Sequence, residues 1–280
     1  MSAQLEKQPW LAQFSADLVS VDEHTRLGHT MHYGPLRVQR PFYPEGKDLI
    51  HLYLLHPPGG LVGGDELNIK LHLGPDSHGL LTTPSAGKIY RNITSLNQGQ
   101  NVNLTVCDGA SLEWLPMENI IFNGAIAELN TSIDIHGSGI YMGWEITCLG
   151  RTECNEMFSD GAIKQTLILN RDGKVLFKDR LNLIAGSELQ TNKAGFQGFS
   201  VLGSFIVSSE PDFDYGQWQQ EMNEKIAPCF IAITQRQGVL IARVLTHKSE
   251  TARMVFEALW ATLRPLVIKR EACAPRIWNT

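Results

Sequence analysis

The segment LIHLYLLHPPGGLVGGDELNIKLHL, residues 49–73, contains two apolar runs joined by a turn of unusual composition. The turn, HPPGGLVGGD at residues 56–65, has four glycines, two prolines and one acid. Glycine allows positive φ and close approach of the backbone, whereas proline fixes φ and removes a backbone donor. Four glycines are expected to shape this loop: Gly59, Gly60, Gly63 and Gly64. The loop presents Asp65, and such loops often carry function, although a tight turn without chemistry fits the same residues.

The residues around this loop exclude two nucleotide-binding motifs. A dinucleotide-binding turn needs G-x-G-x-x-G at the start of a helix, but GGLVGGD is followed by an alternating, strand-like run. At TTPSAGKIY, the pair Gly87-Lys88 lacks the upstream glycine and the following Ser or Thr of a phosphate loop. Neither segment predicts a nucleotide site.

Between residues 49 and 183, short apolar or alternating runs are separated by glycine turns. The runs are LIHLYLL, LNIKLHL, NVNLTV, ELNTSIDIH, IYMGWEIT, AIKQTLILN and KVLFKDRLNL. Alternation with a period of two is typical of β-strands. Asp172-Gly173 separates the last two runs, and it predicts a hairpin from Gln165 to Leu183 because Asp-Gly favours a tight hairpin turn.

Three glycines recur thirty residues apart, at Gly79, Gly109 and Gly139, and each is soon followed by a similar stretch. Recurrence of this length is typical of stacked coils, in which each unit buries its apolar face against its neighbours. The copies are imperfect, and with 25 glycines in the chain three of them can fall at this spacing by chance. We nevertheless predict a mainly β fold of wound, solenoid-like strands rather than a sandwich, with a few helices.

Two helices are predicted near the C-terminal end. Residues 250–263 carry apolar side chains at helical spacing: Ala252, Val255, Phe256, Leu259, Trp260 and Leu263. Ser249 is expected to cap this helix, and Pro265 is expected to end it. Residues 214–226 carry a second stripe: Tyr215, Trp218, Met222 and Ile226. Both stripes are expected to face the core. No low-complexity linker divides the chain, so residues 1–280 are predicted to form one domain.

Composition and charge exclude several classes of protein. The chain has 280 residues, of which 43% are hydrophobic and 19% charged, as is typical of a globular protein. Its formal net charge of −5 argues against a nucleic-acid partner, which needs clustered Lys and Arg. The five scattered cysteines predict neither a disulfide framework nor a closed zinc site. No run approaches the roughly 18 apolar residues of a membrane span, and the N-terminal residues lack a secretory pattern, so we expect a cytoplasmic protein.

The polar residues that could carry chemistry lie within the predicted β region. They are Asp65; Lys88, Tyr90 and Arg91; Glu113 and Glu118; and Glu145, Arg151, Glu153 and Glu156. Carboxylates beside Trp, Leu and Ile are costly to bury unless they are paired or bind a cation. An ion pair such as Glu145 with Arg151 explains these carboxylates as well as a bound metal cation does. No nucleophile motif is found, so covalent catalysis is not expected.

Six segments carry a resemblance to a known family when they are taken in order. They are RPFYPEG (40–46), HPPGGLVGGD (56–65), LTTPSAGKIYR (81–91), LEWLPMENIIF (112–122), GWEITCLGR (143–151) and PRIWNT (275–280). Together they resemble the urease accessory protein family UreD, also called UreH, over nearly the whole chain. The resemblance implies a mostly β, helical-coil fold with a few helices. Cys154 and Asn155 depart from the small residues expected after LGR.

The resemblance further implies a chaperone for urease maturation that is not an enzyme. Its implied partners are UreF, the GTPase UreG and apo-urease, and its implied cargo is nickel, with no tightly bound cofactor. It also implies an internal water-filled passage for the ion. The candidate nickel contacts are Asp65, Glu118, Glu145 and Glu156. The candidate supporting network is Lys88, Tyr90, Arg91 and Arg151. Carboxylates suit such a passage, because strong nitrogen or thiolate sites would retain nickel.

Two other functions fit the same residues. A β-solenoid enzyme acting on a polysaccharide would use carboxylates along one groove, although no paired-acid motif is evident here. A structural adaptor without any metal contact would also lack dense clusters of Cys and His.

Overall fold

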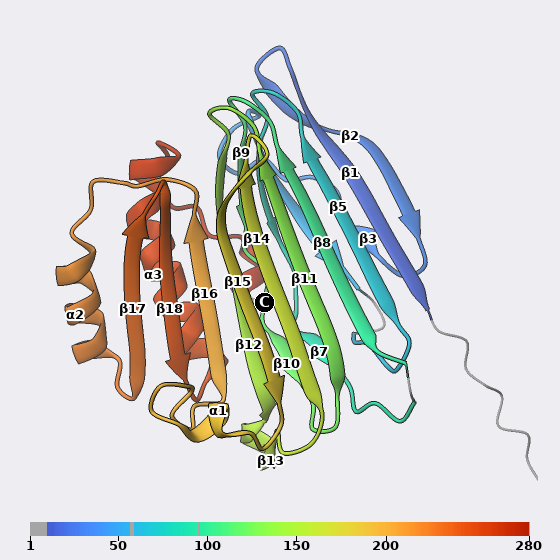
Figure 1. Cartoon of the computed structure of the whole chain (residues 1–280). Helices are drawn as coiled ribbons and strands as arrows, with labels where there is room; N and C mark the ends of the chain where they lie inside the picture. Colours follow the sequence, from blue (N-terminus) through green and yellow to red (C-terminus); the bar gives the residue numbers. More distant parts are fainter. Residues whose placement is uncertain (1–9, 57–58, 95, 280) are drawn as a thin grey trace, which may run out of the picture.

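The computed structural model describes residues 10–56, 59–94 and 96–279 and shows a chain wound into coils between two β-sheets (Figure 1). Pro57, Pro58 and Thr280, which belong to segments quoted above, lie outside these residues. The fold is mainly β and solenoid-like, as the sequence predicts. No helix in the described part of the chain is long and apolar enough to cross a membrane.

The first sheet has seven strands in the order β15-β14-β11-β8-β5-β1-β2. Its strands are β1 (Leu11–Val21), β2 (His24–Tyr33), β5 (Glu66–Leu73), β8 (Gln98–Val106), β11 (Ile126–Ile135), β14 (Ala162–Arg171) and β15 (Lys174–Ile184). The five central strands run parallel, and β2 and β15 pair antiparallel at the two edges. The β14–β15 hairpin turns at Asp172 and Gly173, as predicted.

The second sheet has eleven strands, with the main order β17-β18-β16-β12-β9-β6-β4-β3. These are β3 (Arg37–Val38), β4 (Leu49–Leu55), β6 (His78–Thr82), β9 (Ser111–Trp114), β12 (Ile140–Arg151), β16 (Val201–Val207), β17 (Cys229–Arg236) and β18 (Val239–Thr246). Three short strands extend it beside β12: β7 (Gly87–Ile89), β10 (Asn119–Ile121) and β13 (Glu156–Met157).

The thirty-residue recurrence is the repeat of the coil. Ser111 pairs in parallel with His78 of the preceding coil and with Ile140 of the following one. Each coil therefore places one strand in each sheet before the chain returns to the next coil (Figure 1). Parallel sheets covered on both faces tolerate long apolar runs, and β4 is buried along nearly its whole length.

Two apolar cores result from this arrangement. The first lies between the two sheets, and the second lies between the outer face of the second sheet and helix α3 (Ser249–Val267). Strand β12 contributes to both, because its side chains alternate: Tyr141 belongs to the first core, and Met142 and Trp144 belong to the second. This alternation also directs Glu145 toward the space between the sheets.

Helix α3 confirms the predicted apolar stripe, since all six predicted positions are buried. Its ends differ from the prediction. Ser249 is the first helical residue, Lys248 precedes it as N-cap without a side-chain bond, and Pro265 lies inside the helix. Proline near the C-terminal end removes only one bond of the helical ladder, and continuation of the helix buries Val267 in the second core.

The other helices are shorter. Helix α2 (Tyr215–Lys225) begins at Asp214, whose side chain accepts a hydrogen bond from Gln217 N at 3.0 Å, as expected of an N-cap. The predicted α2 stripe is half-buried and packs against the second core. Helix α1 (Glu188–Thr191) lies in the connection between β15 and β16, and a 3₁₀ turn at Arg276–Asn279 ends the described chain.

Candidate functional site

The described part of the glycine-rich loop before β5 requires glycine for two different reasons. Gly59 and Gly64 have φ of 74° and 88°, a region that L-residues with side chains rarely adopt. Gly60 is needed because of close packing: a Cβ there would lie 2.5 Å from the Tyr90 ring. Gly63 would similarly meet the side chain of Thr94. The loop is therefore held against the segment that follows β7.

Asp65 is buried at the end of this loop, with 8% of its surface exposed. Its Oδ1 accepts a hydrogen bond from Trp10 N and its Oδ2 accepts one from Val62 N, both at 3.0 Å. Both carboxylate oxygens thus bind backbone amides, one in the loop itself and one immediately before β1. In this arrangement Asp65 joins the start of the first strand to the glycine-rich loop.

Replacing Asp65 by Asn is expected to lower the free energy of unfolding by about 1–3 kcal/mol, because one of the two backbone amides would lose its acceptor on this buried side chain. Urea denaturation measures this loss. The neighbouring Glu66→Gln change is the matched control, since Glu66 is exposed and accepts hydrogen bonds only from side chains. Equal stability of the two variants would show that the bonds from Trp10 and Val62 contribute nothing.

Glu145 lies on β12 and is enclosed between the two sheets. Its Oε1 accepts a hydrogen bond from Thr131 Oγ1 at 2.5 Å, and its Oε2 accepts one from Gln165 Nε2 at 2.7 Å. Burial raises the pKa of Glu145 above its ordinary value, and Asp179 adds to the rise, while the two hydrogen bonds oppose it. The site therefore holds a carboxyl group with neutral polar partners and no directly paired cation.

Two cavities meet at Glu145. The smaller, of about 90 Å³, is lined by polar residues and by apolar side chains and the loop that contains residues 83–87; the polar residues outside this loop are Glu145, Thr131, His56, Gln100 and Asn119. The larger, of about 400 Å³, is lined by Glu145, Gln165, Asp179 and Arg243 among others. Glu145 thus lies where a route between the two cavities would pass, with Thr131 on one side and Gln165 on the other.

Arg151 pairs with Glu156 and not with Glu145, so the pairing considered from the sequence is wrong. Arg151 Nε donates to Glu156 Oε2 at 2.7 Å, and the second Glu156 oxygen accepts a bond from Asn123 N at 2.8 Å. Strand β13 returns Glu156 beside the end of β12, which brings the two charges together. Burial alone would raise the pKa of Glu156, but the bonds from Arg151 and Asn123 outweigh it and lower the pKa.

Of the other predicted residues, Gly59 lines the smaller cavity, whereas Lys88, Tyr90, Arg91 and Glu118 line neither cavity. Tyr90 packs edge-on against Phe122 at 4.9 Å, and the Arg151 guanidinium lies 4.3 Å from the same ring, so the structure brings these two together. Lys88 and Arg91 are exposed. Glu118 Oε1 accepts a hydrogen bond from Ser249 Oγ at 3.2 Å, which links the first turn of α3 to the solenoid.

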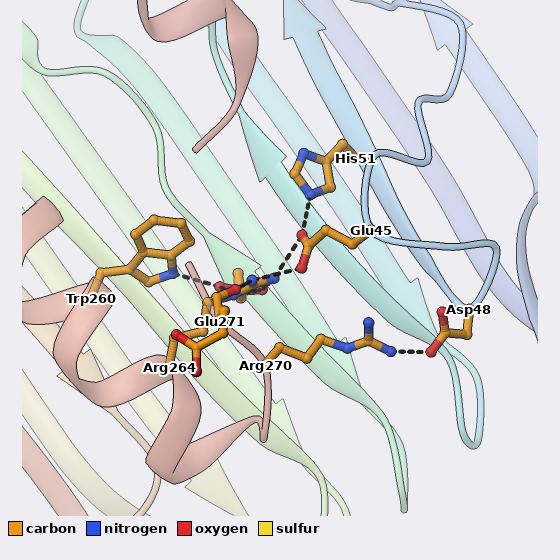
Figure 2. A network of polar contacts seen from close by, with 8 residues as sticks. Glu45, Asp48, His51, Trp260, Arg264, Arg270 and Glu271 are labelled. Atoms are coloured by element: carbon orange, nitrogen blue, oxygen red, sulfur yellow. Dashed lines mark hydrogen bonds and ion pairs between the residues drawn. The ribbon is translucent and has the colours of Figure 1, made fainter. Parts of the chain in front are cut away.

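A buried ionic network between α3 and the second sheet was missed by the sequence analysis as a connected unit. Figure 2 shows Arg264 beside Glu45, which in turn meets His51. Arg264 also donates to Glu113 through Nε at 2.9 Å, and Trp260 Nε1 donates to Glu113 Oε2 at 2.6 Å. Burial would lower the pKa of Arg264, but its two carboxylate partners raise it. One arginine within the apolar stripe of a helix is the signal that could have indicated this network.

None of the described residues form a group of three or more His, Cys, Asp or Glu side chains suited to hold a metal ion.

Comparisons with known proteins agree with the six sequence segments. The family described as UreD urease accessory protein matches residues 12–279. A urease accessory protein UreD from Dechloromonas aromatica is 38% identical over 288 residues, which cover 99% of this chain and 98% of the relative. The protein of the same name from Alcanivorax borkumensis is 42% identical over 261 residues, covering 91% and 86%. That from Hahella chejuensis is 39% identical over 283 residues, covering 97% and 91%. With a family match along nearly its whole length and relatives of this identity, the chain belongs to the UreD family of urease accessory proteins.

Proposed function

We propose that this chain is a chaperone for urease maturation, without catalytic turnover of its own, that helps deliver nickel to the urease active site. It joins UreF-like and UreG-like proteins in a complex with apo-urease. Membership in a family named for accessory proteins supports this role. The same membership weighs against a carbohydrate-active solenoid enzyme.

The observation that supports an internal nickel passage is the position of Glu145 in both cavities. At about 30 Å³ per water, the larger cavity has room for about a dozen waters and the smaller for about three. An ion with its water ligands therefore has more room in the larger cavity than in the smaller. Glu145 lies at the junction, where its carboxylate can replace a water ligand.

The chemistry around Glu145 suits brief contact with a divalent ion. Thr131, Gln165 and Thr147 supply hydroxyl and amide oxygens near the carboxyl group, and Thr147 Oγ1 donates to Gln165 Oε1 at 3.1 Å. Burial also raises the pKa of Glu145, so a proton competes more strongly with an entering cation for this carboxylate. Both features limit the affinity, and a passage requires weak binding so that the ion leaves again.

The remaining candidates for nickel contact are Asp65, Glu118 and Glu156, and each already binds protein donors. If all four acids contribute to a route, removing any of them should reduce nickel delivery. If the passage involves Glu145 alone, only its removal should do so. A metal-free adaptor predicts that none of the changes affects nickel delivery while the complexes persist.

Replacing Glu145 by Gln is expected to lower the nickel content of urease about tenfold at limiting nickel, since even outer-shell changes cost roughly 10–100-fold in metal affinity or activity. Gln keeps the size of the side chain and removes its charge. Glu156→Gln is compared with it, because the Glu156 carboxylate lies outside both cavities and a loss of nickel in this variant would support a route that uses all four acids. Nickel per urease site, pull-down of the UreF-like partner and urease, and melting temperature are measured together.

Three outcomes are informative. Reduced nickel with Glu145→Gln alone, and intact complexes, supports a passage at Glu145. Normal nickel with both variants contradicts the passage and favours an adaptor. Loss of the complexes with Glu145→Gln assigns this residue to structure.

A further inference from the structure

The larger cavity contains an ion pair that joins the two sheets beside Glu145. Arg243 NH1 lies 2.9 Å from Asp179 Oδ2. Arg243 belongs to β18 of the second sheet, and Asp179 belongs to β15 at the edge of the first. Both residues line the cavity together with Glu145. The pair therefore lies on the side of the cavity where β15, the edge strand of the first sheet, faces β18 of the second sheet.

The sheet register aligns Arg243 with Glu145. Glu145 pairs with Ser204 on β16, and Ser204 pairs with Arg243 on β18, so the three residues form one row across three strands. The side chains of one such row point to the same face of a sheet. Arg243 and Glu145 thus lie on the cavity face of the second sheet, and Asp179 approaches that row from the first sheet.

The lining of this cavity includes both acidic and basic residues. Its charged lining residues are Glu145, Asp179, Arg180 and Arg243. A divalent cation that enters would need the Asp179 carboxylate, which Arg243 already contacts. The Arg243 side chain is 49% exposed and that of Asp179 is 29% exposed. Pairs with this exposure contribute about 0–1 kcal/mol, so the guanidinium is easily displaced.

We propose that Arg243 is an exchangeable counter-cation: its guanidinium holds Asp179 while the cavity is empty and releases it when a divalent cation enters. Asp179 is then a further contact for the ion, on the wide side of Glu145. Competition from Arg243 keeps the binding of the ion weak, so that the ion is not retained. This inference rests on the proposed nickel passage and adds to it a residue that sets the affinity of the cavity.

The test is a nickel titration of the full-length chain, by competition with a chelating dye. Arg243→Gln is expected to tighten nickel binding by up to about fivefold, because a competing pair worth at most about 1 kcal/mol weakens ion binding by no more than that factor. Arg180→Gln is the matched control, because it removes the same charge from a residue that lines the cavity but whose exposed side chain lies on the opposite face of β15 from Asp179. Its affinity is expected to stay close to that of the unaltered chain. Adding Asp179→Asn to Arg243→Gln is expected to abolish the gain.

Two results would overturn the proposal: unchanged affinity in Arg243→Gln, or equal tightening in Arg180→Gln, which would indicate a general effect of charge. Melting temperatures of all variants are compared, and little change is expected because the pair is partly exposed. The titration is independent of urease. Tighter nickel binding in Arg243→Gln, together with a normal nickel content of urease in Glu145→Gln, would establish the exchange and reject the passage. Unchanged nickel binding in Arg243→Gln, together with a reduced nickel content of urease in Glu145→Gln, would reject the exchange alone.

Discussion

Replacing Arg264 by Met is expected to lower the free energy of unfolding by about 3–5 kcal/mol, because it leaves the buried Glu113 and the partly buried Glu45 carboxylates without this cation. The Arg264 side chain is fully buried, and Glu113 is 1% exposed. Met preserves much of the apolar length of the side chain, so the loss reports on charge and hydrogen bonding. In a thermal scan the midpoint should fall by on the order of 10 °C.

Arg151→Met is the matched control for Arg264→Met. Arg151 also pairs with a glutamate, but its side chain is 43% exposed. An exposed pair contributes about 0–1 kcal/mol, and the contact of Arg151 with the Phe122 ring adds about 0.5–1 kcal/mol. If both variants lost the same stability, burial would not be what makes the Arg264 network important. A large loss of stability in Arg264→Met alone would confirm that this network stabilises the packing of α3 against the solenoid.

Replacing Phe256 by Ala is expected to destabilise the protein by about 3–5 kcal/mol through loss of buried area and formation of a cavity. Phe256 is fully buried on α3, and its ring lies 5.8 Å from that of Phe205. Gly203 leaves space for this ring, since a Cβ there would lie 2.6 Å from it. The second core therefore depends on a large side chain on the helix facing a glycine on β16.

Met254→Ala tests whether this cost comes from the buried face of the helix. Met254 lies on the same helix, and 49% of its surface is exposed. Changes at such surface positions usually stay within about 0.5 kcal/mol. Chemical denaturation of the two variants, compared with the unaltered chain, measures the difference. Similar losses for both would contradict the placement of the α3 stripe against the second sheet.

Local patterns predicted the strands and helices well, because side-chain direction repeats every two residues in a strand and every 3.6 in a helix. The run LIHLYLL corresponds to β4 at Leu49–Leu55. The α3 stripe was predicted at every buried apolar position from Ala252 to Leu263. The exact helix ends were less predictable, since the helix continues past Pro265 where burial of Val267 compensates for the lost backbone bond.

The partners of the charged residues could not be predicted in the same way. Arg151 pairs with Glu156, five residues away, because β13 folds back on β12. Glu145 instead meets Thr131 and Gln165, which come from the strands of the opposite sheet. Arg264 meets Glu113 across a separation of 151 residues. Each contact depends on the register between coils, which neighbouring residues in the sequence do not encode.

The sequence by itself determined the wound β fold, the apolar face of α3, the shaped loop before Asp65 and the resemblance to the UreD family, because each depends on local periodicity or on an ordered set of short segments. Only the tertiary structure decided that Asp65 binds backbone amides, that Glu145 lies between two cavities, and that Arg243 faces Asp179 across the larger one. The physical reason is that burial and charge pairing depend on which strands the winding places opposite each other, and that arrangement is a property of the whole chain.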